Sequence, residues 1–432
     1  MMERYEKYKD SGVEWIGEIP EGWSSSRLKY QVTINDESLP ETTDDDYQIK
    51  YVDISSVKSG EGIINYQEFL FVNSPSRARR IVRHGDVIVS TVRTYLKSIA
   101  KIEDPDENLI VSTGFAVIRP RRVNSSYLGY AFYSDHLIGE IISRSKGVSY
   151  PAINASEIGD ISTPIPSNEY QTAIANYLDR KTAEIDELIA QKERLIELYE
   201  EEKTAIINQA VTKGVDPDVR LKDSDIDWLG EIPEKGDTAT LKRVCKFVQG
   251  QQVSLEDQSF LPFKNSKRFV RIENYTQNSP DFRFADFGNS DVYEVDESEV
   301  VLVRYGASAG SAVRGIKGVI ANNLFMVRPK NNELVNDYLF YFLKSMYRYF
   351  QLEMSGSAMP ALTFAMIEYI CIPIVPKKEQ LLIVEFIEAQ TKRLEAKIAK
   401  TKKIIELKKE YRTALISEVV TGKIKVTEGT TP

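Results

Sequence analysis

The histidines and the glycine-rich segment of this chain are the first residues to consider for catalysis. His84 and His136 are the only histidines, and neither has the spacing of an acid–base pair or of metal ligands. The segment 306–310 (GASAG) follows a predicted strand, but residues 310–317 lack the Gly-Lys-Ser/Thr ending of a phosphate-binding loop. These residues therefore favour ordinary structural roles over nucleotide binding.

Two acidic groups could also take part in chemistry. Glu201, Glu202 and Lys203 have the residue types of a nuclease site, yet they lie in a predicted helix, where such neighbours are common. The run 44–46 (DDD) could bind a cation or form a solvated turn. The chain contains no Asn/Asp-Pro-Pro-aromatic tetrapeptide, so no amino-methyltransferase site is predicted. The residues favour a binding protein with no metal and no cofactor of its own.

Composition sets the broad class of the protein. Its 432 residues, with 42% hydrophobic and 28% charged side chains, predict a globular protein of about two to four domains. No apolar run is long enough to span a bilayer, and the N-terminus does not resemble a signal peptide. Cys245 and Cys371 are far apart and outside any CxxC spacing, which argues against a disulfide framework or a cysteine zinc site. A cytoplasmic location is expected.

The charge is unevenly distributed along the chain. The net charge of −8 has the wrong sign for a protein that coats nucleic acid without specificity. Residues 1–69 carry 7 basic and 15 acidic side chains, whereas residues 70–122 carry 10 basic and 5 acidic ones. A local anion-binding face is therefore possible on an acidic protein.

An internal repeat organises the chain. The segment 9–21 (KDSGVEWIGEIPE) returns as 222–234 (KDSDIDWLGEIPE), with nine of thirteen positions identical at an offset of 213. After a four-residue length difference the offset becomes 209, and the matched pairs are Gly147 with Gly356, Pro151 with Pro360, and Gln171 with Gln380. One unit of about 200 residues, present twice, explains this order better than two unrelated domains that share a motif.

Each unit ends in a long predicted helix. Residues 169–211 contain no proline or glycine, and apolar residues recur every seven positions, which predicts a helix of roughly 60 Å that packs on another helix. The first window, 169–213, has net charge −4 and its match, 378–422, has +3, which favours pairing of the two helices over two solvated faces. The predicted pairing and subunit-interface residues are Leu178, Ile185, Leu188, Leu195, Tyr199, Ile206, Ile387, Leu394, Ile398, Ile405 and Leu415.

With its repeat aligned, the chain resembles the DNA-specificity (S) subunits of type I restriction–modification systems. The resemblance covers nearly the whole chain and rests on the order of its motifs: KDSGVEWIGEIPEGW, GDVIVSTVRTYLK, PIPSNEYQ and AVTKGVD, then PIVPKKEQ and VVTGKI in the second copy. The second copy departs from the pattern at 234–236, where Glu-Lys-Gly replaces Glu-Gly-Trp, and at 298–299, where Ser-Glu replaces Gly-Asp. Residue roles therefore transfer less securely to that copy.

The resemblance implies an α+β fold with pseudo-two-fold symmetry. Two similar, strand-rich target-recognition domains are expected at 1–167 and 214–376. Two conserved helices, at 168–213 and 377–425, are expected to form an antiparallel coiled coil between them.

The resemblance also implies a function without catalysis. S subunits read a bipartite sequence in double-stranded DNA and recruit two modification (methyltransferase) subunits, which bind S-adenosylmethionine and methylate adenine. Restriction subunits can join the complex. A coiled-coil scaffold that binds protein partners is the alternative, and steep salt dependence of DNA binding would distinguish the two. A fragment of a fused restriction–methylation enzyme is disfavoured by the missing catalytic motifs.

Basic and polar side chains near the matched strands are the candidate DNA contacts. Arginine suits guanine, hydroxyl groups suit any base, and basic side chains suit phosphates; each of these residues could equally be a solvated surface side chain. The candidates are Arg77, Arg79, Arg80, Arg83, Ser90, Thr91, Arg93, Tyr95, Lys97, Lys264, Lys267, Arg268, Arg271, Arg304, Tyr305 and Ser308. The polar turns 147–150 and 355–357 are further candidates. Segments 30–85 and 243–298 show no convincing similarity, which predicts two unlike half-sites.

Overall fold

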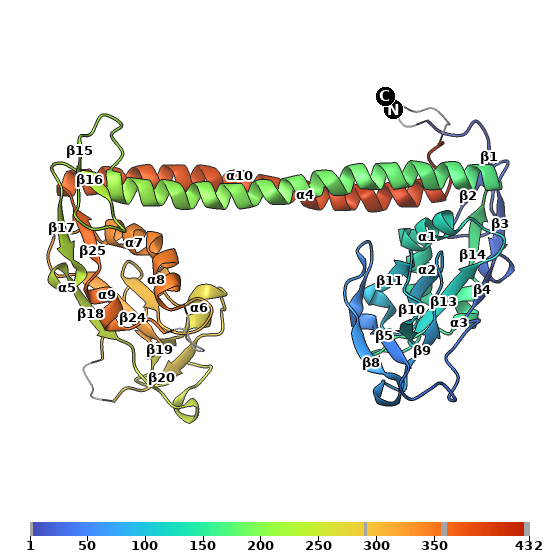
Figure 1. Ribbon diagram of the computed structural model, residues 1–432, viewed down its shortest axis with the longest axis horizontal. Helices are drawn as coiled ribbons and strands as arrows, with labels where there is room; N and C mark the ends of the chain where they lie inside the picture. The colour runs from blue at the N-terminus through green and yellow to red at the C-terminus, as the bar shows by residue number, and fades with distance from the viewer. Residues whose placement is uncertain (1–2, 289–291, 356–360, 427–432) are drawn as a thin grey trace. The chain divides into compact units, whose positions relative to one another are not determined.

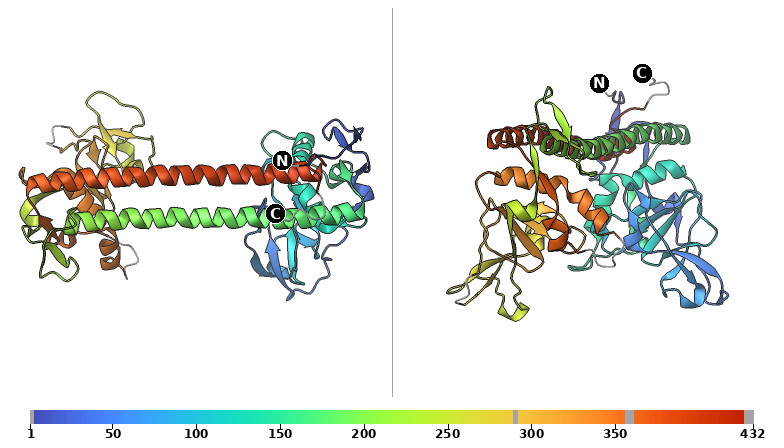
Figure 2. Two further views of the ribbon diagram at one scale, coloured as in Figure 1. Left: turned by 90° about the horizontal axis from the view of Figure 1, so that it is seen from above. Right: turned by 60° about the vertical axis from the view of Figure 1, so that its left-hand side comes forward.

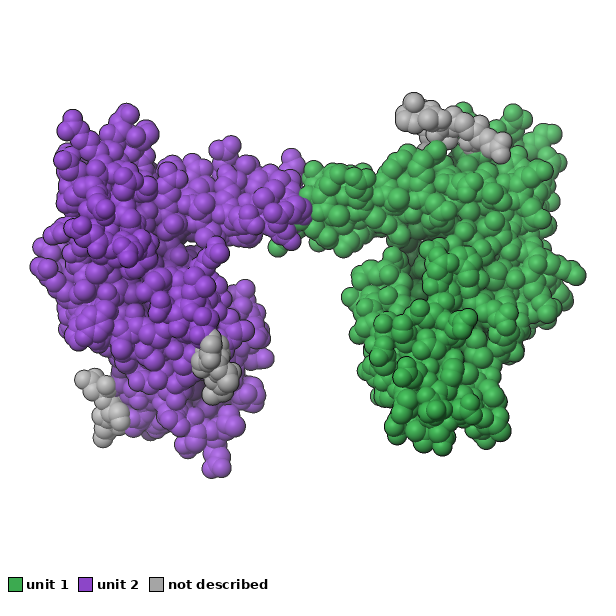
Figure 3. All heavy atoms as spheres, in the orientation of Figure 1, with its two compact units in different colours: residues 1–193, 402–432 green, residues 194–401 purple. Residues whose placement is uncertain are grey.

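The computed structural model describes residues 3–288, 292–355 and 361–426. The chain falls into two compact units: unit 1 contains residues 1–193 and 402–432, and unit 2 contains residues 194–401 (Figure 3). Both units combine strands with helices, which confirms the predicted α+β class. Gly356, Ser357 and Pro360, named above in the repeat and in a polar turn, lie outside the described residues.

Unit 1 contains two four-stranded sheets. The antiparallel sheet, in the order β11-β10-β13-β4, consists of β4 (Val32–Ile34), β10 (Val87–Ser90), β11 (Ile99–Lys101) and β13 (Phe115–Pro120). The mixed sheet, in the order β8-β5-β12-β9, consists of β5 (Gln48–Val52), β8 (Gln67–Leu70), β9 (Ala78–Ile81) and β12 (Leu109–Ser112). Side chains from both sheets, among them Ile88, Val111 and Val117, form one apolar core.

Shorter elements complete unit 1. Three strand pairs are β1 (Tyr8–Asp10) with β2 (Glu18–Pro20), β3 (Ser24–Arg27) with β14 (Ser162–Ile165), and β6 (Val57–Lys58) with β7 (Gly62–Ile63). The short helices are α1 (Ser125–Tyr133), α2 (Asp135–Arg144) and α3 (Ala155–Gly159). Asn124 and Ser134 begin α1 and α2 because their side chains accept hydrogen bonds from the first free amides of each helix.

Unit 2 repeats this plan. Its strand pairs are β15 (Leu221–Asp223) with β16 (Glu231–Pro233) and β17 (Asp237–Thr240) with β25 (Cys371–Ile374). Its sheets are β18 (Cys245–Gln249), β24 (Leu324–Pro329), β21 (Val300–Val303) and β22 (Ala312–Val313), and then β20 (Arg283–Ala285), β19 (Lys267–Val270) and β23 (Val319–Ile320). Its short helices are α5 (Leu241–Val244), α6 (Ile272–Thr276), α7 (Asn336–Ser345), α8 (Tyr347–Glu353) and α9 (Phe364–Glu368).

The strand registers show that the duplication extends into the segments where sequence similarity is lost. In the matched framework, Ile88 of β10 pairs with β13 as Val301 of β21 pairs with β24, at offsets of 213 and 209. In the dissimilar segments, Val52 of β5 lies beside β12 in parallel, and Val270 of β19 lies beside β23 in the same way. The two segments thus share a strand arrangement that their sequences do not reveal.

Two long helices, α4 (Asn168–Lys213) and α10 (Lys377–Val420), each contribute one part to unit 1 and one part to unit 2. In unit 1 they lie side by side and antiparallel (Figure 2). Asp186 of α4 contacts Arg412 of α10 at 3.0 Å, and Glu193, one heptad later, contacts the earlier residue Lys409 at 3.9 Å. The predicted antiparallel pairing is therefore present in this unit.

Unit 2 contains the same antiparallel arrangement. Tyr199 of α4 lies 5.0 Å below the Lys397 ammonium group of α10, and Lys203 lies 3.5 Å from Glu395. In unit 1 the acids of these ion pairs belong to α4, as its net negative charge suggests, whereas in unit 2 the acid belongs to α10 and the lysine to α4. In the part of the chain that the structure describes, no helix is both long and apolar enough to cross a membrane.

One tyrosine in each unit fixes the helix ends to the strands. In unit 1, the Tyr127 hydroxyl of α1 lies 2.8 Å from a carbonyl oxygen of β14 and 3.2 Å from that of Val420, the last residue of α10. In unit 2, the Tyr338 hydroxyl of α7 lies 3.0 Å from a carbonyl oxygen of β25 and 2.9 Å from that of Val211 near the end of α4. Figure 1 shows α1 and α7 directly beneath the helix pair of their own unit.

Candidate nucleic-acid interface

Unit 1 has an open cleft of about 580 Å³ beside the loop that follows β10. Arg77, directly before β9, and Arg93, in that loop, both contribute to it, and neither is paired with a carboxylate among the described residues. The cleft is lined by Tyr51, Asp53, Ile54, Ser55, Arg77, Val92, Arg93, Leu96, Ser112 and Tyr150. Two unpaired guanidinium groups favour an anionic or acceptor-rich ligand, such as a phosphate or the edge of a guanine.

Arg93 is held in an unusual backbone conformation. It has φ 51° and Lys97 has φ 53°, so two left-handed residues flank the single 3-10 turn Thr94–Leu96. The Arg93 amide donates to the Pro151 carbonyl at 2.7 Å, and its guanidinium carbon lies 4.7 Å from the centre of the Tyr150 ring. Left-handed non-glycine residues cost energy and often occur at functional sites. The surrounding contacts thus fix the direction of Arg93.

The predicted polar turn 147–150 lies against the same loop. Val92 pairs with Ala152 in an antiparallel bridge, and the amide of the next residue, Ile153, donates to the Thr91 carbonyl at 2.9 Å. The tip of the turn exposes the side chains of Val148 and Tyr150. Two segments about sixty residues apart in sequence therefore form one continuous edge of the cleft.

Three residues of the four-arginine cluster have side-chain partners, and Arg77 has none among the described residues. Arg77 is exposed. Arg79 stacks on the Phe71 ring at 4.6 Å, and Arg80 donates to the Ser38 hydroxyl at 3.3 Å. Both carboxylate oxygens of Glu37 accept hydrogen bonds from Arg83, at 2.6 and 2.9 Å. Arg77 has the clearest access to a ligand in this group.

The loop after β10, which carries several of the predicted DNA contacts, also contains residues that support the fold. Ser90 is 2% exposed, and its hydroxyl donates to the Val92 carbonyl at 2.5 Å. The Thr91 hydroxyl donates to the Gly114 carbonyl at 2.9 Å. Both hydroxyl groups therefore donate their hydrogen bonds inside unit 1. Tyr95 and Lys97 are exposed; the Lys97 ammonium lies 3.5 Å from Asp135.

A buried acid at the start of β10 and of β21 pairs with an arginine of the neighbouring strand. Asp86, directly before β10, accepts hydrogen bonds from Arg119 at 2.8 and 3.0 Å, and this contact raises the pKa of the arginine. In unit 2, Glu299 occupies the matched position 3.6 Å from Arg328. Burial, together with a hydrogen bond to Glu299, raises the pKa of Tyr293 to about 12. The change from Gly-Asp to Ser-Glu therefore alters the acid and keeps the pair.

Unit 2 presents a different arginine in the matched loop. Arg304 occupies the backbone position that Thr91 has in unit 1. The Thr91 amide donates to the Gly114 carbonyl at 2.8 Å, and the Arg304 amide donates to the corresponding Asn323 carbonyl at 2.9 Å. Its guanidinium carbon lies 4.7 Å from the Tyr305 ring centre and 5.1 Å from that of Phe325, and its Nε is buried without a partner. Tyr305 is at the exposed side of the loop, and Ser308 is partly buried.

The second basic cluster lies around β19. Lys264 is exposed before this strand, and Arg268 stacks on the Phe282 ring at 4.5 Å. Lys267 and Arg271 each pair with a nearby glutamate, at 3.8 and 2.7 Å. As in unit 1, only part of the basic cluster is available to an external anion.

One matched position reverses its charge between the units. Asp53 follows β5, caps the 3-10 turn Ile54–Ser56 by accepting from the Ser56 amide at 3.0 Å, and lines the cleft. The register of the parallel strands places Arg271 at the same point after β19, where its Nε is buried without a partner. The two units therefore differ in charge at a position where their backbones correspond.

The predicted helix-pairing residues divide into a buried and a partly buried group. The buried residues are Leu178, Ile185, Ile387, Leu394, Ile398, Ile405 and Leu415. The partly buried residues are Leu188, Leu195, Tyr199 and Ile206. Other buried residues of the two helices include Thr182, Ile189, Ile207, Ala210, Val211 and Thr401. Residues seven positions apart are displaced by about 20° around a straight helix. A series of such residues therefore moves gradually away from the buried face.

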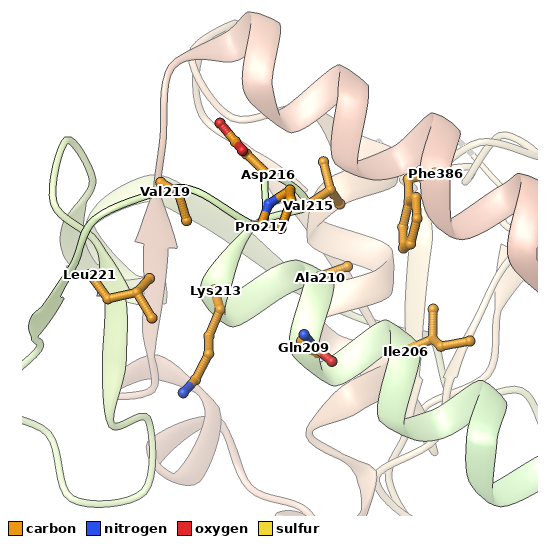
Figure 4. Close-up of a pocket in the computed structure, with 11 residues that line it drawn as sticks. Ile206, Gln209, Ala210, Lys213, Val215, Asp216, Pro217, Val219, Leu221 and Phe386 are labelled. Atoms are coloured by element: carbon orange, nitrogen blue, oxygen red, sulfur yellow. The ribbon is translucent and has the colours of Figure 1, made fainter.

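A smaller cavity of about 250 Å³ lies in unit 2 where α4 ends (Figure 4). Phe386 of α10 and Ile206 of α4 line one side, and Val215 and Pro217 of the segment after α4 line the other. Lys213 also lines the cavity. The sequence repeat identified this exit segment but not the cavity.

The remaining candidates for chemistry lie outside both loops. The His84 ring accepts a hydrogen bond from the Asp104 amide at 3.2 Å, and His136 stacks on Trp15. Glu201 is exposed on α4, and Lys203 lies 3.0 Å from the nearby Glu200. Across the described residues, no group of three or more His, Cys, Asp or Glu side chains could hold a metal ion.

Comparison with known proteins gives a consistent family. Residues 20–198 and 233–408 match the family described as the type I restriction modification DNA specificity domain. A protein of Methanocaldococcus jannaschii assigned as the type I restriction enzyme MjaX specificity subunit is 25% identical over 438 residues, covering 95% of this chain and 96% of its own.

Two solved structures share the fold. A chain from a study of complex assembly and conformational transition of the type I R-M system has a TM-score of 0.70 at 23% identity, with 93% of this chain and 98% of that chain covered. The HsdS subunit from Thermoanaerobacter tengcongensis has a TM-score of 0.53 at 24% identity, with 94% and 98% covered.

Proposed function

Because this chain belongs to the family of type I restriction modification DNA specificity proteins, we propose that each of its units reads one half of a bipartite DNA target. The chain supplies sequence specificity and performs no catalysis. The modification subunits that it recruits bind S-adenosylmethionine and transfer the methyl group, and restriction subunits join the same complex. Calorimetric titration of the isolated chain with S-adenosylmethionine should give no stoichiometric heat; one site per chain would contradict this division of roles.

The observation that carries the proposal is the contrast between framework and loops. The matched ion pairs, Asp86 with Arg119 and Glu299 with Arg328, hold the same strand in both units. The side chains around that strand differ, with the exposed Arg93 in one unit and the partly buried Arg304 in the other. A conserved frame with unlike exposed groups is what two readers of different sequences require.

The first reader is centred on the cleft of unit 1. Arg93, fixed over Tyr150, approaches base edges, and Arg77, which lines the same cleft, neutralises a phosphate. Tyr95 and Lys97 extend the same loop. In the second reader, Arg304 and Tyr305 take the base-reading role, and Lys264 and Arg268 contact the backbone.

Two modification subunits dock on the paired helices, one in each unit. The helices leave large apolar side chains exposed on their outer surfaces, Leu407 and Tyr411 in unit 1 and Leu198, Leu382 and Phe386 in unit 2. The cavity next to Phe386 offers a place for an apolar side chain of a partner. A stoichiometry of two modification subunits per chain in native mass spectrometry is expected, and a single subunit would contradict it.

A protein-binding scaffold is the competing function, and salt dependence separates the two. If the chain with its modification subunits reads DNA, its affinity for duplex DNA falls steeply between 50 and 200 mM salt because counterions are released. Deleting the gene should also remove one methylated motif from the host genome. Salt-independent association and an unchanged methylome would favour the scaffold.

A further inference from the structure

The connection between β18 and β19 in unit 2 exposes an unusual number of large apolar side chains. Within residues 255–263, here called the apolar loop, Leu255 is 82% exposed, Phe260 62%, Leu261 75% and Phe263 46%. Single exposed apolar residues are ordinary on protein surfaces, but four in one short loop indicate a surface that is covered in use.

The apolar loop is ordered by local hydrogen bonds rather than by a core. The Ser259 hydroxyl accepts from the Leu261 amide at 3.1 Å, and Ser259 pairs with Phe284 of β20 in an antiparallel bridge. The Ser266 hydroxyl accepts from the Phe263 amide at 2.9 Å. These contacts satisfy the backbone while the apolar side chains point outward, so the loop is a preformed projection.

The segment that follows the apolar loop is basic. Glu256 and Asp257 lie in the first part of the loop, but from Gln258 to Arg271 the chain carries four basic residues and no acid, although the whole protein has a net charge of −8. The guanidinium carbon of Arg283 lies 3.2 Å from the centre of the Phe260 ring, and its Nε is buried without a partner. A ligand for this surface must therefore combine negative charge with flat apolar groups.

The matched connection in unit 1 has the opposite character. Between β4 and β5, residues 35–47 contain six carboxylates and no lysine or arginine. Their one large aliphatic side chain, Leu39, packs against the core of unit 1. The two connections join corresponding strands, so the difference belongs to the ligand of each unit and not to the fold.

We infer that the apolar loop inserts into the base stack of the second half-site and kinks it, whereas the first half-site stays stacked. This inference rests on the proposed function. Phe260, Leu261 and Phe263 act as the wedge, and Lys264 and Arg268 bind the flanking phosphates. Duplex DNA meets both requirements of the surface, since it offers apolar base faces between two lines of negative charge.

The test uses the full chain assembled with its modification subunits and a duplex containing the methylated motif. 2-Aminopurine, which brightens when unstacked, is placed at successive steps of each half-site. The wild-type complex should brighten the probe in the second half-site only. The triple variant F260A/L261A/F263A should lose this signal and bind at least about tenfold more weakly. Its salt dependence should be unchanged because it keeps every phosphate contact.

Matched controls separate the possible outcomes. The triple variant D44N/D45N/D46N alters the corresponding connection of unit 1 and should leave the fluorescence pattern unchanged. If the wedge variant binds and brightens DNA as the wild type does, or loses only its association with modification subunits, the inference is overturned and the loop is a protein-docking surface. If the wild-type complex does not prefer the motif to a scrambled duplex, the proposed function fails together with it.

Discussion

The two units differ most where their backbones agree. Tyr127 and Tyr338 hold their helix ends in the same way, and the register of the central strands repeats residue by residue. At corresponding points, however, Asp53 is replaced by Arg271, and an acidic connection is replaced by an apolar one. Buried polar pairs preserve a fold through sequence divergence, while exposed positions on that fold are free to change with the ligand.

Substitutions in the paired helices, which both units share, should have the largest effect on stability and assembly. Replacing Ile185 of unit 1 and Leu394 of unit 2, which are 6% and 2% exposed, by Asp would bury unpaired charges and cost several kcal/mol. Thermal unfolding and size-exclusion chromatography with modification subunits should show a much lower Tm and lost assembly. The exposed-position control A190D/A396D should retain both. Intact assembly in the core variant would contradict this account of the helices.

The pairs Asp86–Arg119 and Glu299–Arg328 test whether both units gain the same stability from this contact. Asp86→Ala leaves Arg119 partly buried without its acid and should cost unit 1 about 3–5 kcal/mol. Glu299→Ala should cost unit 2 less, because its distance to Arg328 is longer and Arg328 is more exposed. Hydrogen exchange resolved by unit would measure each loss separately. Equal losses in both units would mean that the geometry of the pair does not set its contribution.

Arg93 and Arg304 test whether the two units recognise bases independently. Arg93→Ala should weaken recognition of the first half-site by about 1–3 kcal/mol and leave discrimination in the second unchanged. Arg304→Ala should do the reverse. Competition binding with duplexes substituted in one half-site at a time gives the readout. A variant that relaxes both half-sites together would show that the readers are not independent.

The tyrosine contacts should give the smallest and most equal effects. Tyr127→Phe and Tyr338→Phe each remove one hydroxyl from between two buried carbonyl groups, and each should cost about 1 kcal/mol. Limited proteolysis near Val420 and Val211 would report loosening of the corresponding helix end. A large difference between the two variants would mean that the units are joined to the helices in different ways.

The repeat and the long helices could be predicted because they depend on local patterns. Matched motifs and seven-residue steps predicted the duplicated architecture, and seven of the eleven predicted helix-pairing residues are buried, including Leu178 and Leu394. The exact buried face of the helices was harder to predict. Leu188 and Leu195 were predicted to pair and are only partly buried, whereas Ile207 and Ala210, which lie off the seven-residue step, are buried.

The candidate site was only partly predictable. Basic residues near the matched strands were visible in the sequence, but their partners were not: Glu37 engages Arg83, and Tyr150 stacks beneath Arg93. Such pairs join segments far apart in sequence, so no local pattern encodes them. Ser90 shows the same limit, because its burial depends on the position of β10 between β11 and β13 in the folded sheet.

The central claim is that each unit reads one half-site on its own. The direct test replaces residues 24–166, which lie in unit 1, by the corresponding domain of another specificity protein and compares the methylated motifs of the two host strains by methylome sequencing. The account predicts an asymmetric motif in which one half-site changes while the other keeps its sequence. A palindromic motif, or a swap that alters both halves, would contradict it.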